Sequence, residues 1–442
     1  MDNVKTIRSD GIEFTVDEEG VLIELKTFKD DIFIPHILPD GTEINLIGID
    51  CMAHRKKAFG KIEISDDISM VNPGAFSHIL AKEVVWPDSC HIIPADCFAD
   101  SLIDKISGIG NVDTVETGAF FDLKSNVIEW PSKCKTIPYN CFFNARIKQL
   151  IGTEEVTEIK ADAFAACRIT EFKWPTKCTV IPEKCFFMAH LSKITNVDNV
   201  TRIGKEAFRN SALLSFTAPE GLKEIGSGAF KGCTSLTALT LNDNIKKIGN
   251  SAFWGVNIDF IKWPQGCKSI PKNCFQSCKR LGYIVGIETV TSIEDAAFAG
   301  CCSLHYICWP DRCTAIPERC FKGCKKLETV DIPDTVTSVG KRAFERSGIT
   351  KVRWPSGCSE IPSLCFPASK LAEVTNVDHV SKIGASAFLK TPQDLKIDLS
   401  KTLFEFSFSI FSLYHKDSEN IELPYYLSDD IKSKLYACHN DY

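Results

Sequence analysis

Residues 327–344, LETVDIPDTVTSVGKRAF, contain the pattern that decides the fold of this chain. Apolar residues lie fourteen, twelve, eight and five positions before Phe344, and an alanine directly precedes it. A repeat of 22 or 23 residues indicates a solenoid, in which each unit buries its apolar face only by stacking on its neighbours. The phenylalanines that mark this repeat are Phe76, Phe98, Phe120, Phe142, Phe164, Phe186, Phe208, Phe230, Phe253, Phe275, Phe298, Phe321, Phe344, Phe366 and Phe388.

Two degenerate units, with Met52 and Phe411 in the phenylalanine position, extend the series to 17 repeats. The apolar residues fourteen and twelve places before each phenylalanine bracket one residue that points the other way, as in a short strand. Gly or Pro beside the apolar residue at position −5 then turns the chain. The Ala-Phe segment is too short for an independent helix, so we expect one helical turn or a compact loop. These features predict an α/β-type repeat solenoid with one parallel β-sheet face, one short strand per repeat and little helix.

The stretches 290–304 and 327–340 resemble the BspA-type leucine-rich repeat, and the resemblance extends over roughly residues 47–411. It implies a right-handed leucine-rich-repeat solenoid that is used for binding, commonly on microbial surfaces in adhesion or host interaction. The family supplies no catalytic residues to transfer to this chain.

The segments before and after the repeats are expected to cap the two open ends of the solenoid. Residues 12–25 alternate around the turn residue Gly20, which predicts a β-hairpin within an N-terminal cap of residues 1–46. Residues 47–411 form the expected solenoid, as one elongated domain. Ser428 followed by two aspartates is a helix N-terminus signal, which predicts a C-terminal cap with a short helix in residues 412–442.

A second pattern doubles the repeat. Six repeats carry Trp-Pro-x-x-Cys-x-x-Ile-Pro-x-x-Cys-Phe, and the repeat that follows usually has Gly or Asn in the Trp position. We expect the ring to lie over a small residue in the next repeat, because a core of fixed spacing accepts Trp only where its neighbour leaves room. Ala218 and Leu241 replace both members of one pair, and Ile332 breaks the rule. The tryptophans are Trp86, Trp130, Trp174, Trp263, Trp309 and Trp354, and the small residues are Gly108, Gly152, Asn196, Gly286 and Asn376.

The 21 cysteines raise the alternatives of disulfides, metal binding and packing. Twelve form six pairs in positions that other repeats fill with Val, Ile or Ala, where free Cys behaves as a small hydrophobe. Equivalent cysteines two repeats apart are separated by about 9.6 Å, beyond the roughly 7 Å limit for a disulfide. Cys278, Cys301 and Cys324 share one position in consecutive repeats and are close enough to pair, although reduced thiols are expected. The chain has no C-x-x-C or paired His spacing, so no metal or other cofactor is expected.

The composition limits partners and compartment. The formal net charge is −6 and no Lys/Arg run or basic stripe is visible, so a nucleic-acid partner is not expected. No apolar stretch approaches the roughly 18 residues that span a bilayer. The first ten residues lack an apolar signal region, which favours a cytoplasmic location; a secreted or cell-surface protein whose leader was removed is the alternative. The oligomeric state stays open.

Binding residues on such a scaffold are expected at the outward strand positions, fifteen and thirteen places before each phenylalanine. Phe260, Tyr283 and Tyr306 occupy the first of these positions in consecutive repeats and are flanked by Val285 and Cys308. An exposed apolar cluster with charged margins is typical of a contact site. Cross-strand aromatic pairing, or cover by another part of the chain, is the alternative.

The sequence therefore predicts a non-catalytic scaffold that recognises a protein or glycan through its sheet surface. The alternative is a structural or assembly component whose solenoid makes homo- or hetero-oligomeric contacts. An enzyme is disfavoured, because no nucleophile-base pair, Gly-rich phosphate loop or carboxylate pair is apparent.

Overall fold

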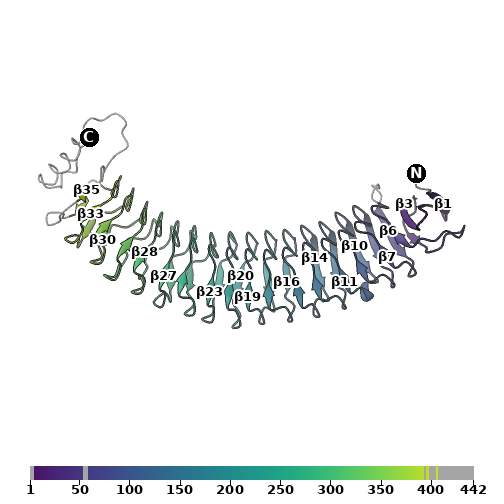
Figure 1. Cartoon of the computed structure of the whole chain (residues 1–442), viewed down its shortest axis with the longest axis horizontal. Helices are drawn as coiled ribbons and strands as arrows, with labels where there is room; N and C mark the ends of the chain where they lie inside the picture. The colour runs from purple at the N-terminus through teal and green to yellow at the C-terminus, as the bar shows by residue number, and fades with distance from the viewer. Residues whose placement is uncertain (1–3, 53–57, 393–394, 398–404, 407–442) are drawn as a thin grey trace, which may run out of the picture. The chain divides into compact units, whose positions relative to one another are not determined.

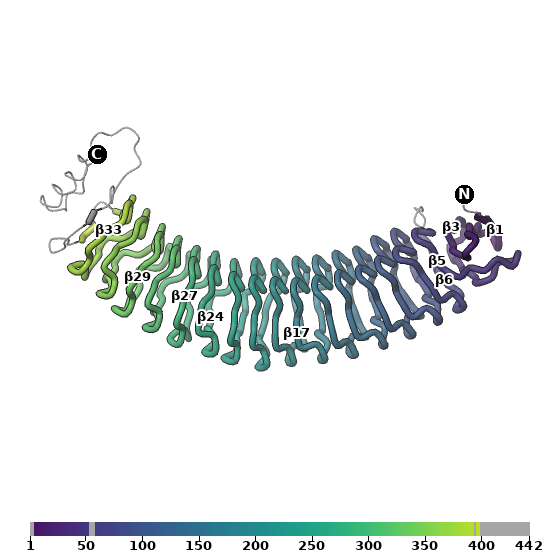
Figure 2. Tube along the Cα trace, viewed as in Figure 1, coloured from purple at the N-terminus to yellow at the C-terminus, as the bar shows by residue number. Residues whose placement is uncertain are grey.

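The computed structural model describes residues 4–52, 58–392, 395–397 and 405–406. The chain divides into two compact units, residues 1–214 and residues 215–442, which are called unit 1 and unit 2 below. Each unit is a β-solenoid in which every repeat makes one coil beside the previous coil (Figure 2). The predicted fold class is confirmed, with about 17 turns of parallel strands and almost no helix.

A typical repeat contains two short strands, so the prediction of one strand per repeat was wrong. In the repeat of Phe186, β16 (Glu171–Lys173) has the buried Phe172 as its central residue, and β17 (Val180–Ile181) ends at position −5. Residues at positions −6 and −5 pair with their counterparts in the next repeat, as Ile181 does with Ile203. A second narrow sheet thus forms where only a turn was expected.

In unit 1, the first and second strands of successive repeats form separate rows, as β6, β10 and β14 do against β7 and β11 in Figure 1. The order β14-β12-β10-β8-β6-β4 makes one six-stranded parallel sheet. The first strands are β4 (Ile32–Ile34), β6 (Ala58–Ile64), β8 (Leu80–Val85), β10 (Leu102–Ser107), β12 (Lys124–Glu129), β14 (Arg146–Ile151), β16 and β18 (Lys193–Thr195). The second strands are β5 (Leu46–Ile47), β7 (Met70–Val71), β9 (Ile92–Ile93), β11 (Thr114–Val115), β13 (Thr136–Ile137), β15 (Glu158–Ile159), β17 and β19 (Arg202–Ile203).

The N-terminal segment begins unit 1 with antiparallel strands. β1 (Lys5–Ser9) pairs with β2 (Ile12–Val16), and β2 pairs with β3 (Val21–Thr27), so residues 12–25 form a hairpin. β3 then pairs in parallel with β5, which joins the hairpin to the second row. A 3₁₀ turn, η1 (Ile109–Asn111), is the only helical element among the described residues.

Unit 2 continues the same two-strand repeat with shorter ladders. Most first strands pair only within a doublet, as β24 does with β26, and one doublet has a single bridge between Cys308 and Asp331. The first strands are β20 (Ser215–Thr217), β22 (Ala238–Thr240), β24 (Phe260–Lys262), β26 (Tyr283–Val285), β30 (Lys351–Arg353), β32 (Glu373–Thr375) and β34 (Lys396–Ile397). The second strands are β21 (Glu224–Ile225), β23 (Lys247–Ile248), β25 (Ser269–Ile270), β27 (Ser292–Ile293), β28 (Ala315–Ile316), β29 (Ser338–Val339), β31 (Glu360–Ile361), β33 (Lys382–Ile383) and β35 (Glu405–Phe406). The predicted C-terminal cap, residues 412–442, lies outside the described residues.

The core of each unit is a column of stacked phenylalanines. All 15 predicted Phe residues are buried, with 0 or 1% of their surface exposed. Successive rings stack with centroids from 5.2 Å apart, between Phe120 and Phe142, to 5.9 Å apart, between Phe298 and Phe321. The ring of each of the six motif Trp residues packs edge-on or tilted against the Phe of its own repeat, as Trp263 does against Phe275 at 5.7 Å.

The Trp-Pro-x-x-Cys motif forms one hydrogen bond in all six copies. The indole Nε1–H donates to the backbone carbonyl of the Cys four residues later, at 3.0 Å between Trp130 and Cys134. This bond satisfies the one polar atom of a ring that is otherwise fully buried. The other five copies are Trp86, Trp174, Trp263, Trp309 and Trp354 with Cys90, Cys178, Cys267, Cys313 and Cys358.

The small residues that follow five of the six motif tryptophans are constrained by their backbone conformation, which the sequence did not lead us to expect. Gly152 has a left-handed φ of 77°, and a Cβ there would lie 2.9 Å from the carbonyl oxygen of Trp130. Asn196 takes the same conformation, with φ 63°, and its Nδ2 donates to the carbonyl oxygen of Trp174 at 2.6 Å. Gly and Asn are the residues that adopt this conformation most readily.

The Ala-Phe segment forms a compact loop with no helix. Residues two places before and two places after the Phe commonly have positive φ, such as Asn140 (52°) and Asn144 (55°) around Phe142. Leu364 takes the same conformation (φ 54°) although it has a branched side chain. The loop therefore imposes its left-handed backbone even on residues that disfavour it.

Candidate functional site

Of the residues predicted to bind a ligand, Phe260, Tyr283 and Val285 lie on first strands of unit 2, Cys308 forms an isolated bridge in the next repeat, and Tyr306 lies two residues before it. β24 and β26 are parallel and in register, which places Phe260 beside Tyr283 and Lys262 beside Val285. The inward residue of β24, Ile261, is buried against the core. The strand alternation thus turns the neighbouring side chains to solvent.

The exposed fractions of these side chains are large for apolar residues. They are 52% for Phe260, 55% for Tyr283, 45% for Tyr306 and 44% for Val285. Cys308 is also exposed, and it is the only cysteine in the described part of the chain that is. No described part of the chain covers the side chains of Phe260, Tyr283 and Tyr306.

The three rings lie in consecutive repeats but do not stack on one another, in contrast to the Phe residues of the core. The Tyr283 ring instead stacks on His305, with centroids 5.7 Å apart and planes inclined by 14°. The backbone N–H of His305 donates to the backbone carbonyl oxygen of Gly282 at 3.2 Å, which links the backbone of His305 to the residue before Tyr283. The sequence interpretation missed His305, although its place directly before Tyr306 was a usable signal. We call the group Phe260, Tyr283, Val285, His305, Tyr306 and Cys308 the aromatic surface.

The hydroxyl of Tyr306, in the last repeat of the aromatic surface, forms a hydrogen bond. The Tyr306 hydroxyl donates to Asp331 Oδ2 at 3.3 Å. Partial burial raises the pKa of the Tyr306 hydroxyl, and negative charge at Cys308 and Asp331 raises it further. Tyr306 is therefore a neutral hydrogen-bond donor at physiological pH.

Charged pairs border the aromatic surface. Arg280 binds Asp259 through two hydrogen bonds of 2.7 Å, directly before Phe260 in the chain. Lys262 Nζ lies 2.9 Å from Asp243 Oδ2. All four side chains are about half exposed, so these pairs contribute little to stability. They fix a polar margin around an apolar centre.

The cysteines of the described residues are free thiols, and nearly all are buried. Cys278, Cys301 and Cys324 do not pair with one another; each thiol donates to a backbone carbonyl, at 3.0, 3.1 and 3.2 Å respectively. Burial raises the pKa of these thiols, to about 12 for Cys278, so they stay protonated at neutral pH. Packing is the interpretation that these contacts favour. No group of three or more His, Cys, Asp or Glu that could hold a metal ion occurs among the described residues.

Comparison with known proteins identifies the family. The model of the BspA type leucine-rich repeat region matches residues 46–169, 114–225, 201–316 and 291–417, which together make up most of the chain. The chain belongs to this family, and the resemblance inferred from the repeat is confirmed. No curated protein matches the chain.

Several solved structures are similar to the chain. A leucine-rich repeat protein from Bacteroides ovatus is 18% identical, with a TM-score of 0.65, over 92% of this chain and 99% of its own length. A leucine rich cell surface protein from Faecalibacterium prausnitzii is 18% identical, with a TM-score of 0.40, over 75% of this chain and 95% of its own. A leucine-rich repeat protein from Eubacterium ventriosum is 20% identical, with a TM-score of 0.40, over 79% of this chain and 96% of its own length. The first likeness supports the fold alone. Within the described residues, no helix has the length and apolar character needed to cross a membrane.

Proposed function

We propose that the chain is a non-catalytic recognition scaffold that binds a protein partner through the aromatic surface of unit 2. The observation that carries the proposal is the register of Phe260 beside Tyr283, with Tyr306 in the next repeat, each about half exposed. The three rings form no stacked pair with one another among the described residues, which weakens the alternative that they only stabilise the sheet by aromatic cross-strand pairing. Exposing three such rings is unfavourable unless a ligand covers them.

The surroundings of the rings favour a protein over a glycan. Val285 and Cys308 extend the apolar area beside the rings, and the pairs Arg280–Asp259 and Lys262–Asp243 lie at its margin. An apolar centre with a polar rim is the usual composition of a protein interface. A glycan bound at the same rings is the alternative outcome of the test below.

The test is capture of a partner from an extract of the source cells, followed by affinity measurement with purified components. We expect Tyr283→Ala or Tyr306→Ala to weaken binding by about 2 kcal/mol or more, because aromatic anchors dominate interface energies. Tyr139→Ala is the matched control, since Tyr139 is 51% exposed and lies in unit 1. Wild-type affinity in both folded unit 2 variants, or an equal loss in Tyr139→Ala, would end the proposal.

The second candidate is assembly of the chain with itself through the same surface. A half-exposed apolar column is also what an isologous contact between two copies would cover. Sedimentation over a range of protein concentrations separates the two candidates. Reversible association that Tyr283→Ala abolishes favours assembly, and a monomer at all concentrations favours a separate partner.

We also propose that residues 1–46 cap the first repeats of unit 1. The parallel pairing of β3 with β5 supports this, because it covers a strand edge that would otherwise be open to other chains. A chain that starts at residue 47 should form aggregates that the full chain does not form. Equal solubility of the two proteins, measured by light scattering, would contradict the proposal.

The free thiols support a proposed reducing compartment such as the cytoplasm, with the cell surface as the alternative. Thiol labelling of intact cells with a reagent that does not cross membranes distinguishes the two. Labelling of Cys308 in intact cells would place the protein at the surface.

A further inference from the structure

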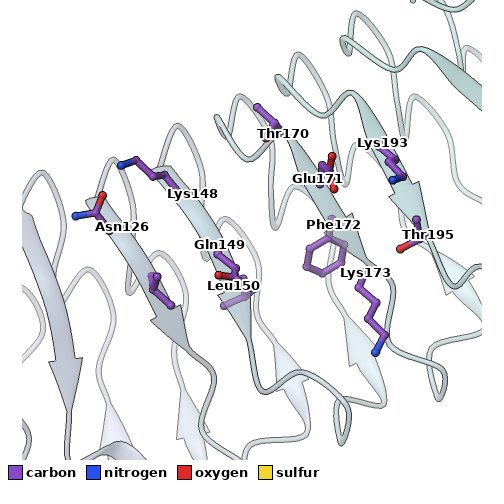
Figure 3. Close-up of a pocket in the computed structure, with 11 residues that line it drawn as sticks. Asn126, Lys148, Gln149, Leu150, Thr170, Glu171, Phe172, Lys173, Lys193 and Thr195 are labelled. Atoms are coloured by element: carbon purple, nitrogen blue, oxygen red, sulfur yellow. The ribbon is translucent and has the colours of Figure 1, made fainter.

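The outward face of unit 1 has a hollow around β12, β14, β16 and β18 (Figure 3). The hollow has a volume of about 680 Å³, and Figure 3 shows Gln149 and Leu150 on one of its sides and Phe172 and Lys173 on the other. Three lysines, Lys148, Lys173 and Lys193, line it together with Glu171. The remaining lining residues are the apolar Val127 and the polar Asn126, Gln149, Thr170 and Thr195.

The hollow arises where the sheet is interrupted. β14 ends the six-stranded sheet, and β16 begins a separate two-stranded sheet with β18. Leu150 on β14 is only half-buried, whereas Phe172 on β16 is buried to 3% exposure. The gap between the two sheets therefore has an apolar floor and polar walls.

A second hollow of about 320 Å³ adjoins the first and shares Asn126 and Lys148 with it. It contains one cation from each of three consecutive repeats, Lys124, Arg146 and Arg168, at the same place in the repeat. The register of β12 and β14 sets Lys124 directly beside Arg146. Parallel strands are about 4.8 Å apart, so these cations recur at that interval along the face. We call the two hollows together the basic hollow.

The six cations of the basic hollow lack the ion pairs that several other exposed cations form. Lys105 pairs with Glu83 at 2.9 Å and Lys351 with Glu373 at 2.9 Å. None of the six forms an ion pair with any carboxylate of the described residues, and the basic hollow has only two carboxylates, Asp104 and Glu171. The molecule carries a net charge of −6, whereas this surface carries six cations and two carboxylates.

One neighbouring acid reduces the contribution of Lys124. The pKa of the Asp100 carboxyl is raised, first by burial and then by a hydrogen bond with Asp122, and Lys124 opposes that shift. Lys124 therefore already interacts electrostatically with the carboxyl group of Asp100. Arg146, Arg168 and Lys148 are the cations that we expect to contribute most to anion binding.

We propose that the basic hollow binds a linear acidic polysaccharide, one that carries sulfate or carboxylate groups along its chain. Cations at regular intervals match a ligand with regularly spaced anionic groups, and neutralising them releases counterions. The amides of Asn126 and Gln149 and the hydroxyls of the two threonines both donate and accept hydrogen bonds, as recognition of sugar hydroxyls requires.

The lining is poorly suited to single-stranded nucleic acid. Such ligands bind through exposed aromatic side chains on which the bases stack. The one aromatic residue that lines the basic hollow, Phe172, is buried in the core. This inference is independent of the proposed protein site, because the residues, the unit and the ligand chemistry all differ.

The experiment measures binding of a labelled, size-defined heparin oligosaccharide to the full chain by fluorescence anisotropy, over a series of salt concentrations. A hyaluronan oligosaccharide of the same length tests carboxylate groups without sulfate, and neutral dextran is the uncharged control. We expect the charged sugars to bind and dextran not to bind. The affinity should fall steeply as salt rises, because ion release accompanies binding.

Arg146→Glu combined with Arg168→Glu should weaken binding at low salt at least about tenfold and reduce the salt dependence. Lys223→Glu combined with Lys246→Glu is the matched control, since these exposed lysines in unit 2 give the same change of net charge. Replacing Lys148, Lys173 and Lys193 together by Gln provides a second test without charge reversal. Circular dichroism verifies that each variant is folded.

Three outcomes overturn the proposal. The first is no binding of either acidic sugar, and the second is an equal loss in the unit 2 control, which would indicate net charge alone. The third is tighter binding of an oligothymidylate or a poly-glutamate peptide than of both sugars, which would assign the basic hollow to nucleic acid or to an acidic peptide.

Discussion

The inward and outward positions of the repeat differ in how much they vary. Inward positions are nearly the same in both units, with stacked Phe rings, Trp rings and buried thiols from Phe76 to Phe388. Outward positions on the same strands carry lysines around β16 in unit 1 and aromatic rings on β24 and β26 in unit 2. The packing of the core fixes the repeat, whereas strand positions that face solvent can change without cost to the fold.

The same contrast explains why one scaffold can present two chemically different surfaces. The aromatic surface is apolar with paired charges at its margin, and the basic hollow is polar with unpaired charges. Both are built on outward residues in or next to the first strands. We therefore expect substitutions in the core to change the unfolding free energy more than substitutions at the surface.

The largest change in unfolding free energy is expected at alkaline pH, because the core contains many buried thiols. Burial raises the pKa of the thiols of Cys167 and Cys278 to about 12, against about 8.5 in an unfolded chain. The folded thiol stays protonated while the unfolded thiol ionises, so each contribution to stability is complete below about pH 8.5 and is lost as pH rises toward 12. Each such thiol should remove about 1.4 kcal/mol of unfolding free energy per pH unit in that window.

Denaturant unfolding in the presence of reductant, at about pH 8 and about pH 10, measures this loss. Cys167→Ala and Cys278→Ala should each make the pH dependence shallower by the contribution of one thiol. An unfolding free energy that does not fall between the two pH values would contradict the assignment of these thiols to the core.

A paired substitution compares the two regions directly. Trp130→Ala should destabilise the fold by about 3–5 kcal/mol, because it leaves a cavity and removes the donor to the Cys134 carbonyl. Tyr283→Ala should change the unfolding free energy by no more than about 0.5 kcal/mol, since its ring is 55% exposed. Thermal melts of the two variants give the comparison, and similar losses in both would show that the aromatic column is part of the packed structure.

Gly152 tests the backbone constraint of the interior. Gly152→Leu should cost about 1–3 kcal/mol, because φ is 77° and a Cβ would crowd the carbonyl oxygen of Trp130. Gly152→Asn should cost clearly less, since Asn196 adopts that conformation and bonds the equivalent carbonyl. Equal melting temperatures of the Leu and Asn variants would favour a purely steric role for the small residue.

The smallest effect is expected at the loop that carries Leu364. Leu364→Asn should stabilise the protein by up to about 1 kcal/mol, because Asn tolerates the left-handed φ of 54° better than a branched side chain does. Asn273 holds the equivalent position in another repeat with φ 57°. A lower melting temperature in Leu364→Asn would mean that packing of the leucine outweighs the backbone strain.

The solenoid could be predicted because its signal is repeated many times. Each Phe and each inward strand residue contributes the same evidence, and the errors of single repeats average out. The second strand was missed because two residues are too few to show an alternating pattern. The backbone role of Gly152 was missed because a small residue in a sequence satisfies either a steric or a conformational demand, and only the structure gives the backbone angle.

The surfaces were predicted unequally for a similar reason. Phe260, Tyr283 and Tyr306 follow from strand alternation, whereas the ring contact with His305 depends on side-chain rotamers that no pattern encodes. The basic hollow escaped notice because its cations never form a run. Lys124, Arg146 and Arg168 are 22 residues apart, so a comparison of equal positions in consecutive repeats would have revealed them.

The central claim, that outward positions carry two independent binding surfaces on one core, is tested most directly by a crossed affinity measurement. The captured protein partner and the heparin oligosaccharide are each titrated against two double variants, Tyr283→Ala with Tyr306→Ala and Arg146→Glu with Arg168→Glu. We expect the tyrosine variant to lose only the protein and the arginine variant to lose only the sugar. Loss of both ligands in either variant, or of neither ligand in both, would contradict the claim.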